Sequence, residues 1–482
     1  MTATQIKHIF LLLQASLLLC GIALLLSTSK IAMAQPTNNL SGYTEGAQTD
    51  LGRAFIYHLH SRYDIVQDPE INHYIRNIGH KIVQHTDNSK RFRFYIINNP
   101  DINAFAGPDG VIGIHTGLIQ SVSTEDELAS VIAHEIAHVT QEHLYRRMVL
   151  QSESSLPQIA SMIAAILIGM HDSNAGMAAL MGSSAYQIEQ QLKYSRLHEY
   201  EADHAGINFL NLSGYDPHAM PDFFEKLANS YQNYGSGAPE ILRTHPLTEN
   251  RLAKAQARAH SLKSDKKPTD NSTLRLIQLR LESVYEAEWV RSFGVTLDKE
   301  TKCYQSALSE ITIKNSNNIP PCLDEIIKSN NQQYLYHAIK LELLSKLPNT
   351  NPKASNIEPS FSYDLFPSNE SMVVRYAAFL VRQEKREHAI EILNNHLSAE
   401  RYKNEVYTML SKLHEDEGNS AKSYYYLALA NLDIGNIKRA AILTEKAKNN
   451  LTQSQDSLEQ EIATLQEKLT KLLKNREDEL GS

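Results

Sequence analysis

The chain has 482 residues, enough for more than one domain with a core of its own. Its 47 basic and 55 acidic residues give a formal net charge of −8, so the charge balance does not indicate a nucleic acid partner. Hydrophobic residues make up 42% and charged residues 21%, a composition that excludes an intrinsically disordered chain and is typical of a globular protein.

The N-terminus has the pattern of an export signal. An apolar run over residues 9–26 follows a basic residue, and Ala32-Met33-Ala34 supplies the small residues of a cleavage site. We expect a signal peptide over residues 1–34 and a soluble, exported mature chain. The alternative is an uncleaved anchor, because ~18 apolar residues can span a bilayer. Lipid attachment at Cys20 is disfavoured because Leu19 before it is too bulky.

Without the signal peptide, the chain contains two cysteines, Cys303 and Cys322. An even number of cysteines in an exported protein favours a disulfide. Two separate buried thiols are the alternative, and the sequence leaves both open.

The first part of the mature chain is expected to combine helices with a small β-sheet. Apolar periodicity predicts helices over residues 42–63 and 69–85, and β-branched runs predict strands over residues 91–98 and 111–115. Residues 103–110, between the strands, are rich in turn formers. The second helix has an apolar stripe formed by Ile71, Ile75, Ile78 and Ile82.

A third helix is expected to begin after Thr124. Thr124 and Glu127 have the spacing of a capping box, in which each side chain bonds a backbone N–H of the first turn. Glu125 and Asp126 add negative charge at the positive end of the helix.

Residues 152–187 are rich in Ala, Met, Ile, Gly and Ser, and form either a buried helix or a mobile lid. Further helices are expected over residues 186–212, 217–234 and 248–261. A stretch of Lys, Pro, Asp and Ser over residues 263–272 then marks a boundary between domains at residues 35–265 and 266–482.

The second domain is expected to consist of helix pairs. Residues 372–397 and 406–432 each read as a pair, and the spacing from Ala389 to Ser423 equals the 34-residue period of tetratricopeptide repeats. Residues 451–473 have the spacing of a capping helix. The chain is therefore predicted to be mainly α, with an α+β domain followed by an α-helical domain of tetratricopeptide-like repeats.

The motif His134-Glu135-Ile136-Ala137-His138 lies within the helix that follows Thr124. Residues four apart share a helix face, so His134 and His138 are candidates to bind one Zn²⁺ side by side. Glu135 is then placed to take a proton from a metal-bound water. This pattern indicates a zinc peptidase.

The third ligand is expected from the helix over residues 186–212. Glu199 and Asp203 lie one turn apart, so Glu199 can complete the metal site while Asp203 holds a histidine ring from behind. Glu201 lies about 200° round the helix from Glu199 and should face away. Leu144 stands where another peptidase class has a third histidine ligand, which disfavours that class.

Other features near the motif receive weaker interpretations. His198 and His204 are expected at the surface, and His115 is expected to be exposed or to face substrate. The edge of the strand over residues 111–115 is a candidate to bind an extended peptide by β-addition.

The motif residues together resemble the gluzincin metallopeptidases, a group that includes the CAAX-prenyl endopeptidases and the heat-shock protease HtpX. The resemblance rests on the HExxH motif, on Glu199-x-x-x-Asp203, and on four short segments: Asn103 to Ala106, Thr116 to Leu118, Ser195-Arg196 and Thr244 to Pro246. With a signal peptide and C-terminal repeats, the chain resembles the periplasmic branch of the group, the β-barrel assembly-enhancing proteases.

The resemblance implies one Zn²⁺ per chain, bound by His134, His138 and Glu199, with Glu135 as the catalytic base. It also implies that His245 is a fourth ligand and a self-inhibitory switch.

It further implies a periplasmic endopeptidase with a chaperone-like role in outer-membrane β-barrel assembly. The implied partners are unfolded or misfolded β-barrel proteins and, through the repeats, the barrel-assembly machinery. Peripheral contact with a membrane is left open. The alternative is a repeat-based chaperone or scaffold with a largely latent peptidase.

Overall fold

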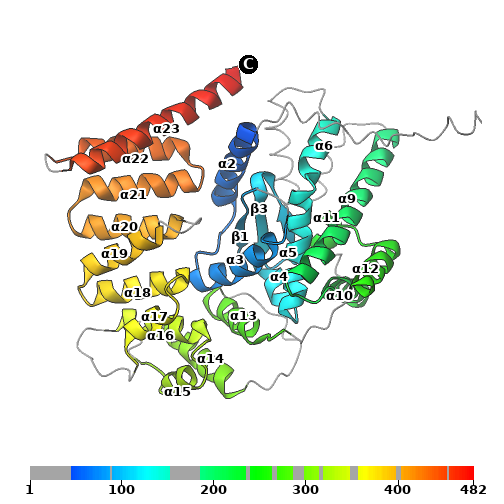
Figure 1. The fold of residues 1–482 in the computed structure, drawn as a ribbon, viewed down its shortest axis with the longest axis horizontal. Coiled ribbons are helices and arrows are strands. Elements are labelled where there is room, and N and C mark those ends of the chain that lie inside the picture. Colours follow the sequence, from blue (N-terminus) through cyan, green and yellow to red (C-terminus); the bar gives the residue numbers. More distant parts are fainter. Residues whose placement is uncertain are drawn as a thin grey trace, which may run out of the picture. The chain divides into compact units, whose positions relative to one another are not determined.

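The computed structural model describes residues 45–86, 90–151, 185–234, 239–262, 269–285, 298–313, 318–347, 357–397, 403–452 and 455–481 (Figure 1). The predicted signal peptide and residues 152–184 of the predicted lid or buried helix lie outside the described residues. Among the helices of the described ranges, none combines the length and the apolar character needed to cross a membrane.

Two helices precede the sheet, α2 (Glu45–Arg62) and α3 (Pro69–Val83). The Asp68 carboxylate caps α3 by accepting a hydrogen bond from the backbone N–H of Ile71, and Pro69 occupies the first turn, where its missing N–H costs nothing. All four isoleucines of the predicted stripe are buried. The helix is therefore positioned by its apolar face, as the sequence predicts.

The sheet contains three strands, β1 (Arg93–Ile97), β2 (Ala104–Ala106) and β3 (Val111–His115), in the order β1-β3-β2. β3 pairs parallel with β1 and antiparallel with β2. The turn-rich stretch over residues 103–110 thus contains a strand that the sequence analysis missed. The predicted binding edge on β3 is wrong, because β3 is central and both of its edges are paired.

Helix α5 (Glu125–Thr140) begins where the sequence predicts. The Thr124 hydroxyl accepts from the backbone N–H of Glu127, and the Glu127 carboxylate accepts from the backbone N–H of Ser123 rather than of Thr124. Leu128, Ile132 and Ile136 are fully buried on its apolar face. The motif helix is therefore fixed at its start and along one side.

Further helices surround α5. They are α4 (Thr116–Ser121), α6 (His143–Gln151), α9 (Ala185–Leu212), α10 (Ala219–Tyr234), α11 (Glu240–Thr244) and α12 (Glu249–Ser261). α9 packs along α5, and α12 packs against α9 (Figure 1). α3 packs on β1, and α5 on β2. This arrangement brings the two predicted motif helices side by side.

After residue 271 the described chain is helical. Its helices are α13 (Ser272–Tyr285), α14 (Lys299–Thr312), α15 (Cys322–Ser329), α16 (Tyr334–Lys346), α17 (Pro359–Leu365), α18 (Glu370–Arg382), α19 (Arg386–Leu397), α20 (Asn404–Asp416), α21 (Ser420–Asp433), α22 (Ile437–Asn449) and α23 (Asp456–Gly481). A disulfide joins Cys303 to Cys322, which decides between the two alternatives for these cysteines.

Consecutive helices from α18 to α23 pack against each other (Figure 1). Gly418 and Gly435 adopt φ of 74° and 75° at the ends of α20 and α21, a left-handed conformation that favours glycine. Asn419 and Asn436 follow and cap the next helices. The same Gly-Asn turn thus recurs between successive helices. The prediction of a mainly α chain with a small sheet is confirmed.

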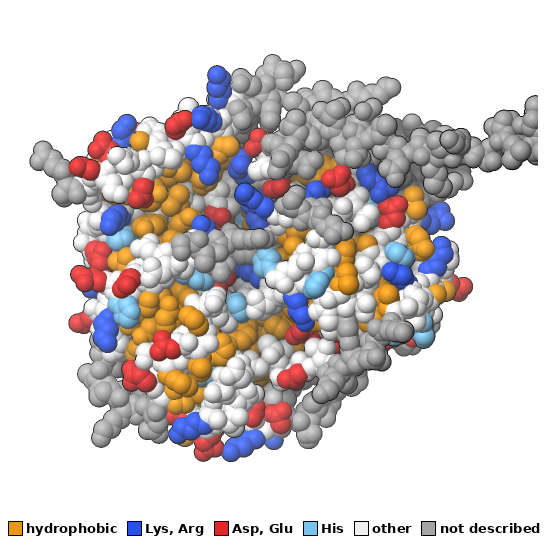
Figure 2. Space-filling model, in the orientation of Figure 1, with side chains coloured by type: hydrophobic (Ala, Val, Ile, Leu, Met, Phe, Trp, Pro, Cys, Tyr) orange, Lys and Arg blue, Asp and Glu red, His pale blue; other side chains and the backbone are white. Residues whose placement is uncertain are grey.

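Figure 2 shows hydrophobic side chains among charged side chains of both signs on the face over α17 to α21. In this part of the chain the rings of Tyr363 and Tyr376 stack with centroids 5.0 Å apart, and Phe379 stacks on Tyr376. Tyr376 is buried and Tyr363 and Phe379 are partly buried, so this stack belongs mainly to the packing between the helices, while Phe361 of α17 is 44% exposed.

Buried ion pairs join α3 to helices that follow it by some 200 residues or more. Arg280 of α13 donates to both carboxylate oxygens of Asp68 at 2.8 and 2.9 Å, and its Nη2 lies 2.8 Å from Glu342 of α16. Arg375 of α18 donates to both oxygens of Glu70 at 2.7 and 2.8 Å. We call these five residues the junction cluster. One hydrophobic core also includes residues on both sides of residue 265, so the domain division there stays a prediction.

Candidate metal centre

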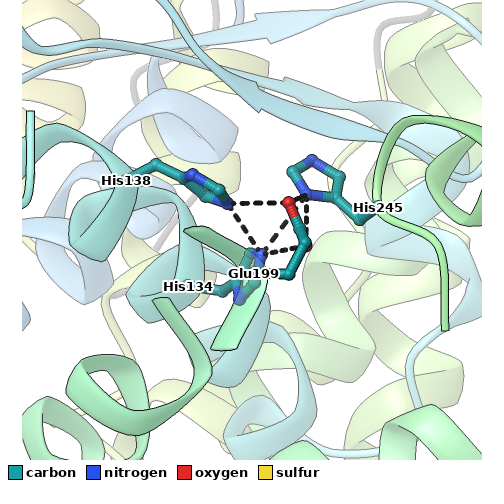
Figure 3. Close-up of side chains that lie close together, drawn as sticks. All are labelled: His134, His138, Glu199 and His245. Atoms are coloured by element: carbon teal, nitrogen blue, oxygen red, sulfur yellow. Dashed lines mark hydrogen bonds and ion pairs between the residues drawn. The ribbon is translucent and has the colours of Figure 1, made fainter. Parts of the chain in front are cut away.

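Helices α5 and α9 bring three candidate ligands together (Figure 3). His134 and His138 lie one turn apart on α5, and their Nε2 atoms are 3.0 Å apart. From α9, Glu199 places Oε2 3.4 Å from Nε2 of His134 and Oε1 3.5 Å from Nε2 of His138. Both histidines thus present the same ring nitrogen toward one carboxylate.

His245 offers a fourth donor from the segment that follows α11 (Figure 3). Its Nδ1 lies 3.3 Å from Nε2 of His134 and 3.1 Å from Oε2 of Glu199. Donor atoms of all four residues lie within 4.8 Å of one another. The backbone N–H of His245 donates to the Ile241 carbonyl, and Arg251 donates to the Pro246 carbonyl, so the segment is held at both ends.

The donors and charges of the centre fit a divalent cation. Two imidazole nitrogens and a carboxylate are a ligand set that zinc takes in proteins. Among the described residues, three buried carboxylates, those of Glu135, Glu199 and Asp203, lie near one guanidinium, that of Arg251. A divalent cation would balance this excess of negative charge, which a buried site needs because charge out of water is costly.

The pKa values of the centre show the same demand for positive charge. Burial alone would lower the pKa of His134, but hydrogen bonding and attraction from Asp203 and Glu199 raise it to about 10. Burial would raise the pKa of Glu199, but the neighbouring histidines hold it well below its usual range. The surroundings of His134 therefore favour positive charge at this point of the centre.

Glu135 differs from the other carboxylates of the centre. It is 1% exposed, and neither of its oxygens has a hydrogen-bond partner among the described residues. Oε1 lies 3.5 Å from Nε2 of His245. A buried carboxylate without a donor is destabilising and calls for an explanation, which here is a chemical role beside the metal.

Asp203 stands behind the ring of His134, with Oδ1 3.0 Å from Nδ1. Arg251 of α12 donates from Nε and Nη2 to the two oxygens of Asp203, each at 2.8 Å, and its Nη1 lies 3.0 Å from Glu199. The sequence analysis missed Arg251. Its signal was a cation in the first turn of a helix, where the helix dipole disfavours positive charge unless an anion partners it.

A second group lies next to His138 and consists of His143, His198 and Glu201. The prediction that His198 is at the surface is wrong: it is 3% exposed, because its ring stacks on that of His143. His204 is exposed, as predicted. Burial lowers the pKa of His143 to about 4, although Glu201 opposes the shift. Glu201 lies outside the group around Glu199.

The prediction for His115 is also wrong. Its side chain is fully buried, because it ends the central strand of the sheet. Its backbone N–H donates to the Asn103 carbonyl, and its ring meets that of Phe105 edge-on. His115 therefore belongs to the core of the sheet rather than to a surface that meets substrate.

An apolar pocket adjoins the centre. Its wall includes Val131, Phe223 and Leu242, and Glu135 and His245 lie at its polar end. Because α11 carries Leu242 and leads into His245, the same segment supplies part of the pocket wall and the fourth donor. The pocket places apolar side chains beside the buried carboxylate of Glu135.

A profile of peptidase family M48 matches residues 69–259, which include all four candidate ligands. A protein of Vibrio cholerae assigned as a β-barrel assembly-enhancing protease is 32% identical over 385 residues, covering 77% of this chain and 78% of its own. The chain belongs to peptidase family M48. Family M48 enzymes are zinc metallopeptidases, so the predictions of a metallopeptidase and of zinc are confirmed.

Two further relatives of this M48 chain match less of it. The β-barrel assembly-enhancing protease of Escherichia coli K12 is 41% identical over 219 residues, which is 45% of each chain. The mitochondrial metalloendopeptidase OMA1 of Arabidopsis thaliana is 31% identical over 170 residues, or 35% of this chain and 32% of its own. The resemblance inferred from the motifs is therefore confirmed.

Proposed function

We propose that this zinc metallopeptidase cleaves unfolded or misfolded outer-membrane β-barrel proteins in the periplasm. One observation carries the catalytic part of the proposal: the buried carboxylate of Glu135 has no hydrogen-bond donor in the part of the chain that the structure describes, and it lies beside the cluster of His134, His138 and Glu199. The names of the V. cholerae and E. coli relatives support a role in β-barrel assembly. The disulfide supports an oxidising compartment.

In the proposed mechanism, His134, His138 and Glu199 hold one zinc ion per chain. When bound, zinc acidifies a water and polarises the scissile carbonyl. Glu135 takes the proton of the attacking water on one of its carboxylate oxygens and delivers it to the leaving amine. Asp203, itself held by Arg251, orients the ring of His134 through Nδ1. The apolar pocket takes a substrate side chain next to the cleaved bond.

We infer a resting state in which His245 closes the centre. Its ring touches His134, Glu199 and Glu135, so it occupies the space that water and substrate need. Because His245 follows the short helix α11, a movement of this segment would open the centre and the apolar pocket together. His245 would thus act as a fourth ligand and a self-inhibitory switch.

The part of the proposal that concerns partners rests on the helix pairs. We propose a peptidase domain over residues 35–265 and a tetratricopeptide-like domain over residues 266–482 that binds barrel precursors or the barrel-assembly machinery. The recurring turns at Gly418 and Gly435 support a repeat architecture, and the exposed ring of Phe361 on α17 supports a binding role. Peripheral contact with a membrane is a further possibility that the same face would serve.

The test compares cleavage of an unfolded outer-membrane β-barrel protein with cleavage of unfolded casein. We expect zinc in the purified protein, loss of cleavage with a chelator, recovery on adding zinc, and faster cleavage of the barrel protein. Equal rates on both substrates would refute the proposed preference, and cleavage that survives chelation would refute the metal mechanism.

The second candidate is a repeat-based chaperone or scaffold with a latent peptidase, and the closed position of His245 favours it. This alternative predicts that envelope defects of cells lacking the protein are rescued equally by wild type and by Glu135→Gln. The peptidase proposal predicts that only the wild type rescues them fully.

A further inference from the structure

The second ligand histidine, His138, has a defined protonation pattern when it binds metal. Its Nε2 points into the centre, 3.0 Å from Nε2 of His134 and 3.5 Å from Glu199. A neutral imidazole that binds a metal through Nε2 carries its proton on Nδ1, and that N–H needs an acceptor. The atom that faces Nδ1 of His138, at 2.8 Å, is Nδ1 of His143.

This contact determines the state of His143. To accept from His138 at Nδ1, the His143 ring must be neutral and must carry its own proton on Nε2. That nitrogen lies 3.0 Å from Oε2 of Glu201, which also accepts from Arg146 at 2.6 Å. His138 then donates to His143 and His143 donates to Glu201, while Arg146 donates to the same Glu201 oxygen from the other side, so every donor of the chain has an acceptor.

A second metal ion among His143, His198 and Glu201 fits less well. The rings of His143 and His198 stack with centroids 4.1 Å apart and planes 12° apart. The lone pairs of stacked rings lie in parallel planes and do not converge on one ion. The Glu201 oxygen nearest to His143 is also already paired with Arg146. The geometry therefore favours a hydrogen-bond chain over a metal site.

We propose that His143 is a positioning residue that connects the carboxylate of Glu201 to the metal ligand His138. It fixes the tautomer and the ring orientation of His138, as Asp203 does directly for His134. The inference rests on the proposed metal site. It assigns to α6 and α9 a function that the motif alone does not reveal.

The simpler alternative is that His143 only fills space, since it is 4% exposed and stacks on His198. Two substitutions separate these roles. His143→Phe keeps a ring to stack on His198 but has no hydrogen-bonding atom. His143→Asn loses the ring but keeps an amide oxygen near the position of Nδ1 as an acceptor.

The experiment measures the zinc dissociation constant of the full chain by competition with a chelator, together with thermal unfolding. We expect His143→Phe to weaken zinc binding by about 10–100-fold, the usual effect of losing such a partner, and His143→Asn to stay within a few-fold of wild type. His204→Asn, on the exposed side of α9, is the control and should bind zinc like wild type.

The inference is overturned if His143→Phe binds zinc as tightly as wild type, or if the Asn variant loses as much affinity as the Phe variant. Should His143→Phe fail to fold, Glu201→Gln decides. It leaves His143 in place, and the inference requires weaker zinc binding from it, so an unchanged dissociation constant refutes the chain. Absence of zinc from the wild type would instead refute the proposed function.

Discussion

Buried carboxylates lie beside guanidinium groups both in the junction cluster and in the metal centre. In the junction cluster Glu70 is fully buried, and Arg375 donates to both of its oxygens. In the metal centre Asp203 has the same two-bond pairing with Arg251, but Glu135 has no hydrogen-bond donor among the described residues. Both regions thus pair a buried carboxylate with a guanidinium. The metal centre differs because it also contains Glu135.

The difference shows that a carboxylate paired with a guanidinium stabilises the fold, whereas a carboxylate without such a partner is available for a reaction. A paired carboxylate recovers in hydrogen bonds most of what it loses by leaving water, and it fastens the elements that supply its partners. An unpaired one keeps its full desolvation cost and its basicity. The junction cluster therefore holds α3 to later helices, while Glu135 is available to take a proton.

The largest effect is expected from Glu135→Gln. The amide cannot accept the water proton, so casein cleavage should fall by about 10²–10⁴-fold. Zinc content and thermal stability should not fall, because a neutral amide removes an unpaired buried charge. Cleavage within tenfold of the wild-type rate would show that Glu135 is not the catalytic base.

In the junction cluster, Arg280→Ala should lower the free energy of unfolding. Loss of one partner leaves Asp68 buried and unpaired, and such losses cost about 3–5 kcal/mol of unfolding free energy. The matched control is Lys299→Ala, because Lys299 pairs with Glu325 while 77% exposed and should cost at most about 1 kcal/mol. Urea unfolding measures both. Equal losses would show that the junction cluster is no stronger than a surface pair.

Asp203→Asn tests the paired carboxylate inside the metal centre. The amide keeps the size of the side chain but gives Arg251 and His134 a weaker partner. Zinc affinity should fall by about 10–100-fold, with a smaller change in unfolding free energy than in Arg280→Ala. Chelator competition measures the affinity. A large loss of stability with unchanged zinc affinity would place Asp203 with the junction cluster instead.

Local signals made much of this centre predictable from sequence. The start of α5, the shared face of His134 and His138, and the phase that separates Glu199 from Glu201 all depend on residues within one or two turns. Helical geometry converts such spacing directly into position. The predicted ligands do lie together for this reason.

Features that depend on distant segments were not predictable in the same way. Which edge of β3 is covered depends on β2, three residues that look like a turn. His198 was misplaced because its burial comes from the stacked ring of His143 on another helix. The role of Arg251 likewise appears only when α12 packs on α9.

A more modest change is expected from His245→Ala. Removing the ring opens the space beside Glu135 and frees one donor position on the metal, so basal casein cleavage should rise. An increase of roughly tenfold corresponds to a loss of about 1.4 kcal/mol, the scale of one hydrogen bond to a charged group. Thr244→Ala, in the same segment, is the control. A variant no more active than wild type would argue against a closed resting state.

A pH-dependent effect concerns Glu405 of α20, which lies beside the junction cluster. Burial and the nearby carboxylate of Glu370 raise the pKa of Glu405 to about 8, against 4.5 for the free side chain. Arg76 stands 3.9 Å away and bonds Glu370 more closely, at 2.5 Å, so it compensates Glu405 incompletely. One carboxyl group here is thus better buried with its proton than without it.

The sign of its effect on stability follows from proton binding. Between the unfolded pKa of 4.5 and the folded pKa of about 8, the folded chain holds more protons at Glu405 than the unfolded chain. Its contribution is therefore fully present below the lower value and is lost as the pH rises through the upper one. Glu405→Gln removes this dependence, so the difference in urea midpoint between variant and wild type should grow from pH 5 to pH 8. Parallel pH profiles would mean that Glu405 is paired like Asp68 and Glu70 and titrates alike in the folded and the unfolded chain.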